Sequence, residues 1–315
     1  MASTEIENFD PTATVDKINK IAADRALNRR RFLSTIGMAG AAAGATALMS
    51  GCTNASTSNM AVNTSGLAQT NLLNFLLNLQ YLEATLYSYM TQGTDLPSSL
   101  RSGSGAVTGA PGVLSFSAQV NDLLNEIYYD EINHVSFLQG ILGSAAAPRP
   151  AINLGALGTL TTTNALSIGR LLEDVGVTAC ASALPGLSSS NATYVAQTLG
   201  TESFHSGALR LLSIQSSAAT INAGDGLDVP PYDPGNASTS ALGPSTNGGF
   251  FASTGGAIAS TNTTVGLGYT RTTSQVLAVL YGSLASSGIA VVPAAAGTAK
   301  GGFFPSGVNG AISTI

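Results

Sequence analysis

Residues 124–142 read LNEIYYDEINHVSFLQGIL, and residues 195–212 read VAQTLGTESFHSGALRLL. In both stretches apolar residues recur every three or four positions, which is the period of one face of an α-helix. Each apolar stripe also carries a Glu-x-x-His pattern, Glu131-x-x-His134 in the first and Glu202-x-x-His205 in the second. Because residues three apart share a helix face, each pair points where the sequence otherwise places leucine and isoleucine.

Two further segments show the same helical period, from about residue 67 to 91 and from about residue 162 to 184. Each carries one glutamate on its apolar stripe, Glu83 in the earlier segment and Glu173 in the later one. An isolated carboxylate inside a helix core is costly unless it is paired or bound to a metal. These two glutamates, like the Glu-x-x-His pairs, are therefore expected to have a buried partner or a bound metal ion.

The first two stretches extend to helices over about 115–142 and 190–216, so the chain has four long amphipathic segments. Four helices of similar length predict an all-α four-helix bundle. The connection over 143–161 contains Pro148 and Pro150 and is long enough to run the length of the bundle as a crossover.

In chain order the stripes supply Glu, Glu-x-x-His, Glu and Glu-x-x-His, which resembles the known ligand pattern of di-iron and di-manganese carboxylate proteins. The six candidate ligands are Glu83, Glu131, His134, Glu173, Glu202 and His205. Two divalent ions would balance four carboxylates, and oxygen and imidazole ligands suit iron or manganese. By the symmetry of the motif, Glu131 and Glu202 are expected to bridge the ions. The expected terminal ligands are Glu83 with His134 and Glu173 with His205.

Charge is scarce in this chain, which gives weight to the pattern. Charged residues make up 9% of the 315 residues, against roughly 25% in a typical soluble domain. Both histidines and four of the five glutamates after residue 51 lie on the stripes, while Glu126 lies off them and is expected to face solvent. The alternative, solvated charges on outward faces, would explain one Glu-x-x-His pattern but not the whole set.

The remaining composition excludes several classes of protein. Hydrophobic residues make up 44% of the chain, enough for a sizeable core. The net charge of −5, without a broad basic face, argues against nucleic acid as a partner. Two cysteines cannot form a disulfide scaffold, and Cys180 is expected to be a buried small hydrophobic residue.

The N-terminal segment, residues 1–51, has the layout of a signal peptide. Arg29-Arg30-Arg31-Phe32-Leu33 precedes a weakly apolar run over 34–51, and this order resembles the bacterial twin-arginine (Tat) export signal. A transmembrane helix is the alternative, although the alanines and glycines suit it poorly. The run ends in a lipobox-like sequence, so Cys52 is a candidate lipid anchor, with plain cleavage nearby as the other outcome. Residues 52–65 are expected to be a tether. The mature protein is expected in the periplasm or anchored to the envelope, with an extracellular location as the alternative.

Beyond residue 217 the chain becomes rich in Gly, Ser and Thr. Over 217–315 we expect mostly irregular structure that packs on the bundle or forms a small appendage, with flexible disorder as the alternative for 218–270. The apolar stretch Ser274–Tyr281 is expected to be a short helix.

Residues from about 66 to 216 resemble the ferritin-like superfamily, and all six ligand positions match its dinuclear iron or manganese pattern. The tail contains GYTRT at 268–272, QVL at 275–277 and GGFFPSGVNG at 301–310. These motifs resemble the C-terminal signature of desiccation-related proteins, which implies an association with stress rather than a particular reaction.

Three functions remain open at this point. The first is an exported di-metal protein acting on oxygen or peroxide, as an oxidase, a ferroxidase or a catalase-like enzyme. The second is a non-enzymatic stress protein with a structural metal site, and the third is iron storage. Tyr87, Tyr128 and Asp130 are secondary candidates for contacts to the ligands, with ordinary packing as the alternative. The oligomeric state stays open.

Overall fold

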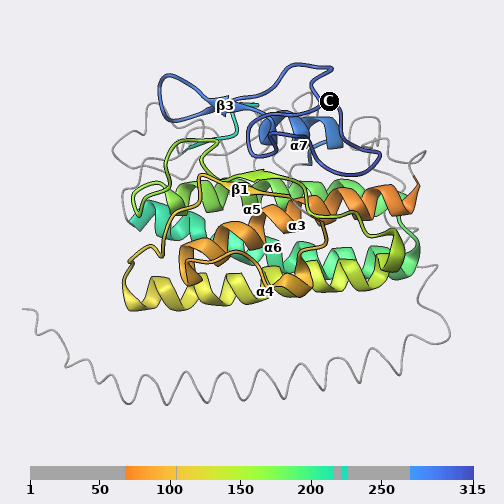
Figure 1. The fold of residues 1–315 in the computed structure, drawn as a ribbon, viewed down its shortest axis with the longest axis horizontal. Helices are drawn as coiled ribbons and strands as arrows, with labels where there is room; N and C mark the ends of the chain where they lie inside the picture. Colours follow the sequence, from red (N-terminus) through yellow and green to blue (C-terminus); the bar gives the residue numbers. More distant parts are fainter. Residues whose placement is uncertain (1–67, 104, 216–220, 226–269) are drawn as a thin grey trace, which may run out of the picture. The chain divides into compact units, whose positions relative to one another are not determined.

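The computed structural model describes residues 68–103, 105–215, 221–225 and 270–315. The predicted signal, the tether with Cys52, and most of the segment 217–269 lie outside the described residues. Figure 1 shows the four long helices side by side. They are α3 (Gln69–Gln92), α4 (Ala118–Leu142), α5 (Ala165–Ala183) and α6 (Ser189–Gln215), which confirms the predicted helical bundle.

The direction of the helices follows from contacts at one end of the bundle. Near the start of α3, the Asn74 side-chain amide donates to the carbonyl of Ala145, just beyond the end of α4. The Gln69 side chain accepts from the backbone N–H of Ser188, just beyond the end of α5. Since α4 and α5 both end beside the start of α3, they are parallel, and the connection between them must cross the bundle.

Local signals set the ends of the helices. The hydroxyl of Ser117 caps the N-terminus of α4 by accepting from the backbone N–H of Val120. Helix α3 ends at Gly93, whose φ of 69° is the left-handed conformation that glycine adopts at little cost. Pro185 lies in a 3₁₀ turn, Leu184–Gly186, that separates α5 from α6.

Short elements that the sequence did not predict tie the connections together. Strand β1 (Val107–Thr108) precedes α4 and pairs in parallel with β2 (Ile152–Asn153) of the crossover. In the C-terminal part, β3 (Ser283–Leu284) and β4 (Val291–Val292) form an antiparallel pair. The expected short helix is α7 (Thr273–Leu280), which starts with a capping box formed by Thr272 and Gln275.

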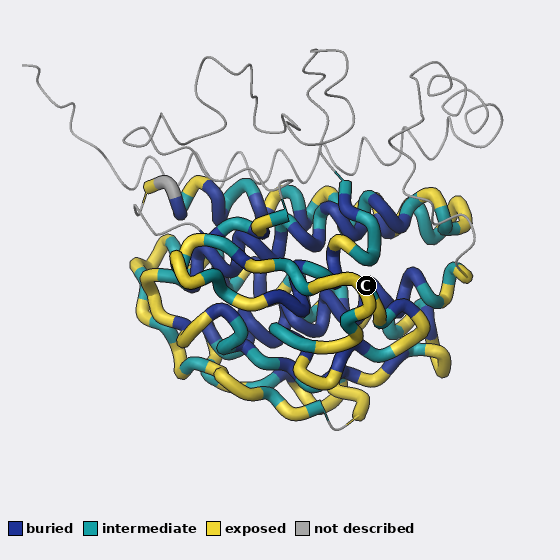
Figure 2. The backbone as a smooth tube through the Cα atoms, turned by 90° about the horizontal axis from the view of Figure 1, so that it is seen from above, coloured by how far each residue is buried: buried dark blue, intermediate teal, exposed yellow. Residues whose placement is uncertain are grey.

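The described C-terminal residues pack on the bundle, over α3 and α5. Asn78 of α3 donates to the carbonyl of Asn309 and accepts from its N–H, and Phe303 and Phe304 are buried in the common core. As a result α3 is buried on nearly all sides, whereas α4 keeps an exposed outer face. Figure 2 shows exposed residues (yellow) along the segment at the C-terminus, in front of buried parts of the chain (dark blue). A helix covered on both sides is mostly apolar around its circumference, and most of the buried residues of α3 are apolar.

Three of the buried arginines among the described residues hold the connections and the tail, and each of these three is paired with an aspartate. Arg149 of the crossover and Arg170 of α5 are almost fully buried, as is Arg271 just before α7. Their partners are Asp95, Asp174 and Asp225, respectively. Among the described residues, no helix combines the length and the apolar character that crossing a bilayer requires.

Candidate metal centre

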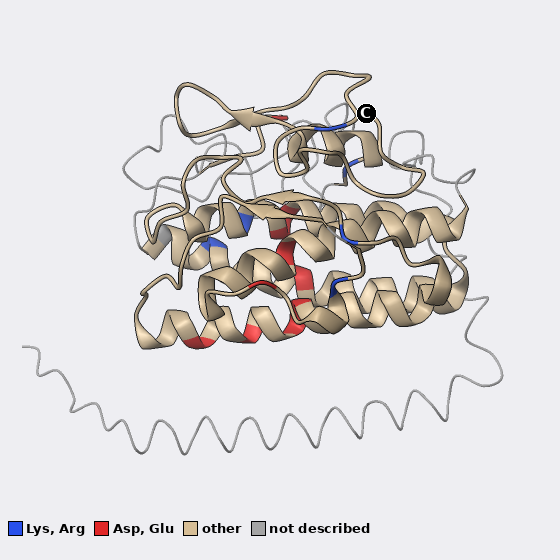
Figure 3. Cartoon of the chain, viewed as in Figure 1, with Lys and Arg blue, Asp and Glu red and all other residues tan. Residues whose placement is uncertain are grey.

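The four stripe glutamates meet in the interior of the bundle, about midway along the helices. Figure 3 shows acidic residues gathered there as a column that passes from helix to helix. Their exposed fractions are 2% for Glu83 and 0% for Glu131, Glu173 and Glu202. Glu126 is exposed, as the sequence predicts.

Glu131 of α4 lies at the centre of the group. Its Oε1 is 3.1 Å from Nδ1 of His205 and 3.4 Å from Nδ1 of His134. Nδ1 of His134 is also 3.4 Å from Oε1 of Glu202, so this imidazole lies between two of the carboxylates. The Glu131 carboxylate thus contacts both histidines, the position that a bridging ligand would occupy.

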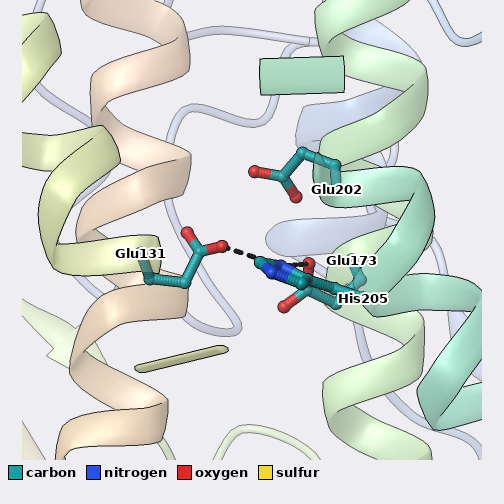
Figure 4. A group of neighbouring side chains, drawn as sticks. All are labelled: Glu131, Glu173, Glu202 and His205. Atoms are coloured by element: carbon teal, nitrogen blue, oxygen red, sulfur yellow. Dashed lines mark hydrogen bonds and ion pairs between the residues drawn. The ribbon is translucent and has the colours of Figure 1, made fainter. Parts of the chain in front are cut away.

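His205 of α6 is held from both sides of its ring. Nδ1 lies 3.2 Å from Oε2 of Glu173, and Nε2 lies 3.2 Å from Oδ2 of Asp130. Figure 4 shows the imidazole between the carboxylates of Glu131 and Glu173. A carboxylate on the outer nitrogen of a histidine fixes the ring and leaves the inner nitrogen to face a metal.

Glu83 of α3 joins the group through a neighbouring amide. The Nε2 group of Gln80 donates to Oε2 of Glu83 at 2.7 Å and to Oε1 of Glu202 at 2.8 Å. The structure therefore brings together all six residues that the sequence singled out. In four of them, Glu131, Glu173, Glu202 and His205, one ligand atom of each residue lies within 4.8 Å of the others.

The site contains an unusually large number of buried polar atoms without a hydrogen-bond partner. Both oxygens of Glu131, Oε1 of Glu173, Oε2 of Glu202 and Nδ1 of His134 have none, although several lie at ion-pair distances from each other. Buried polar atoms in folded proteins are almost always bonded. Such a group of oxygen and imidazole donors fits a bound transition-metal ion, which would satisfy them all at once.

Three buried arginines pair with aspartates rather than with these carboxylates. The buried guanidinium groups of Arg149, Arg170 and Arg271 are each paired with an aspartate. Without metal, protons bound to the carboxyl groups and the histidines reduce the net negative charge of the site. Burial raises the pKa of Glu83 well above its usual range, and the carboxylates of Glu202, Glu131 and Glu173 raise it further.

Both histidines favour the protonated, charged form. Burial lowers the pKa of each imidazole, but adjacent carboxylates more than compensate, bringing the pKa of His134 to about 10 and that of His205 to about 12. In Glu131, burial raises the pKa but the two imidazolium groups lower it by more, so the net shift is downward. Burial raises the pKa of Glu173 well above its usual range despite the opposing charge of His205.

Three residues at the site were not predicted as ligands but contact or shape the group. Asp130, a secondary candidate, bonds to His205. Gln80 was missed because a neutral amide carries no charge signal, although it lies one helical turn before Glu83. Gly176 of α5 also matters, because a Cβ at this position would lie 2.7 Å from both Oε1 of Glu83 and Oε2 of Glu202.

Comparison with known proteins agrees with this architecture. Residues 68–215 match the ferritin-like domain family, a range that covers the four long helices. This part of the chain is a ferritin-like domain with a buried Glu/Glu/Glu/His group able to hold metal. A search of curated proteins found no match to the chain.

Proposed function

We propose that this protein binds two iron or manganese ions in the bundle and uses them in redox chemistry with oxygen or peroxide. The observation that carries the proposal is the convergence of four buried carboxylates and two histidines from four helices. With two divalent ions the six side chains reach charge balance while the histidines are neutral. Iron or manganese in such a site supplies redox equivalents for reactions of oxygen or peroxide.

The residues of the chain have distinct roles in this proposal. Glu131 contacts both histidines and Glu202 contacts His134, so these two carboxylates would be the bridging ligands. Asp130 holds His205 with its Nδ1 toward the metals. The surrounding core keeps bulk water away from the ligands, since the side chain of His134, only 13% exposed, is the most accessible of the six. Electrostatic contacts are stronger in such a dry site.

The direct test is elemental analysis of the full-length protein purified from its own host. We expect about two iron or manganese ions per chain, the number that this type of carboxylate site holds. The double variant Glu131→Ala, His134→Ala should lose most of the metal. Glu126→Ala, on the same helix but exposed, should retain it. Protein that carries no stoichiometric transition metal would refute the proposal.

A second candidate is a structural metal site in a non-enzymatic stress protein. It is favoured by the tail motifs that resemble desiccation-related proteins, and it predicts bound metal without turnover. Consumption of peroxide and of oxygen separates the two candidates, measured on metal-loaded protein against the Glu131→Ala, His134→Ala variant. Equal rates would favour the structural role.

Iron storage is less well supported, because the C-terminal residues cover α3 and α5, surfaces of the bundle that would otherwise face outward. Size-exclusion chromatography that found a particle of about 24 subunits would reverse this judgement.

Export belongs to the same proposal and rests on the sequence. Tat transport would export the folded protein with its metal already bound. A lipid attached to Cys52 would then anchor the protein to the membrane. The double substitution Arg29→Lys, Arg30→Lys should retain the protein in the cytoplasm. Cys52→Ser should release it from the membrane fraction. An unchanged distribution of either variant would refute the corresponding step.

A further inference from the structure

The Gln80 amide lies between two of the candidate ligands that come from different helices. Its side chain is 2% exposed. Its NH₂ group donates two hydrogen bonds, one to Glu83 and one to Glu202. The carbonyl Oε1 of Gln80 is buried without a partner. The opposite amide orientation would place this oxygen against two carboxylates, so the hydrogen-bond network favours the NH₂ group facing the site.

The other oxygens of the same two carboxylates meet beside Gly176. Oε1 of Glu83 and Oε2 of Glu202 each lie 2.7 Å from the point where a Cβ of residue 176 would stand. Oε2 of Glu202 is buried and has no hydrogen-bond partner. Each carboxylate therefore has one oxygen fixed by Gln80 and a second oxygen in the space that the glycine leaves.

The other half of the site lacks this arrangement. Glu173 occupies on α5 the place that Glu83 occupies on α3, and the residue one turn before it is Arg170 instead of a glutamine. The Arg170 guanidinium bonds to Asp174 and to the carbonyl of Ile221. The ligand set is thus close to symmetric, whereas the side chains that orient it are not.

We propose that Gln80 is a positioning residue that orients Glu83 and Glu202 toward one metal position and makes the two metal positions unequal in affinity. This inference rests on the proposed di-metal function. Substituting residues that orient metal ligands typically weakens affinity by about 10–100-fold. Loss of Gln80 should therefore weaken one binding step by that factor and leave the other almost unchanged.

The test is a titration of metal-free, full-length protein with Mn²⁺, followed by calorimetry and by the electron paramagnetic resonance signal of free Mn²⁺. The wild type should bind two ions in two resolved steps. Gln80→Leu should weaken one step by about 10–100-fold. Asn78→Leu is the matched control, because Asn78 is also a buried amide of α3 but bonds to Asn74 and Asn309. It should retain both steps.

A second variant reaches the same carboxylates from the opposite side and covers the case in which Gln80→Leu does not fold. Gly176→Ala should displace Glu83 and Glu202, which are flexible side chains, and weaken the same step. Gly200→Ala is its control, since a Cβ there meets no atom within 4 Å.

The two proposals fail in different ways. Wild-type protein that binds no Mn²⁺ would overturn the proposed function. Two equal sites in the wild type, or equal weakening of both steps in Gln80→Leu and Gly176→Ala, would overturn the role of Gln80 and leave the metal site standing. No change in either variant would have the same consequence.

Discussion

Loading the metal centre at neutral pH should release about four protons per chain, because metal ligands must be deprotonated. The perturbation is the addition of two Mn²⁺ ions per chain to the metal-free protein. The number follows from charge. Four carboxylates and two histidines are electrically neutral as a group when they hold four protons, and also when they hold two divalent ions.

The pKa shifts place protons where this balance needs them. The raised pKa values of about 10 for His134 and about 12 for His205 keep both imidazoles protonated at pH 7. Burial raises the pKa of Glu83 and of Glu173, so both carboxyl groups favour the protonated form. Since binding displaces these protons, the apparent affinity for Mn²⁺ should increase with pH throughout the range below about 10.

Calorimetry in several buffers of different ionisation enthalpy measures the released protons at one pH. The slope of the observed enthalpy against the buffer enthalpy should correspond to about four protons in the wild type. Glu173→Gln removes one titrating group and should lower the value to about three. Glu126→Gln, an exposed residue of α4, should leave it at the wild-type value. A slope near zero would mean that the ions bind elsewhere and would refute the reasoning.

Three further predictions concern stability, measured by urea unfolding. In metal-free protein, the raised pKa of His134 stabilises the fold fully below pH 6.5, so the free energy of unfolding should fall as pH rises from 6.5 to about 10; a steady rise over this window would contradict the protonated site. Arg271→Met leaves Asp225 buried without its guanidinium and should cost about 3–5 kcal/mol; a change below about 1 kcal/mol would mean that the pair contributes little. Gly200→Ala should add about 0.5–1 kcal/mol, because it favours the helix and fits open space; destabilisation would show that this space is not free.

The sequence singled out the residues that meet in the bundle because their signal is local. Glu131 and His134 lie on one helix, and their spacing alone places them on the same face as Leu138. The cost of burying a carboxylate then makes each stripe glutamate informative. Gln80 carries no charge and was therefore not predicted to belong to the site. It lies three residues before Glu83, which is the same spacing as between Glu131 and His134.

Features that depend on the C-terminal residues could not be predicted from the periodicity of a single helix. Arg170 of α5 is fully buried because residues 221–225 and α7 cover the outer face of that helix. The periodicity of one helix shows only which face meets the bundle. It cannot show that a segment some fifty residues later in the chain will cover the opposite face, or that short strands such as β1 and β2 will pair across a loop.

The cover that the C-terminal residues form over α3 has a consequence for the order of folding during synthesis. Phe303, Phe304 and Ile312 are buried in the same core as the leucines of α3, but the ribosome makes them after all four long helices. Emerging chains fold only as fast as their core residues become available. The nascent protein therefore has an apolar helix face uncovered until these residues have been made, and a chain that terminated before Arg271 would keep that face open to aggregation.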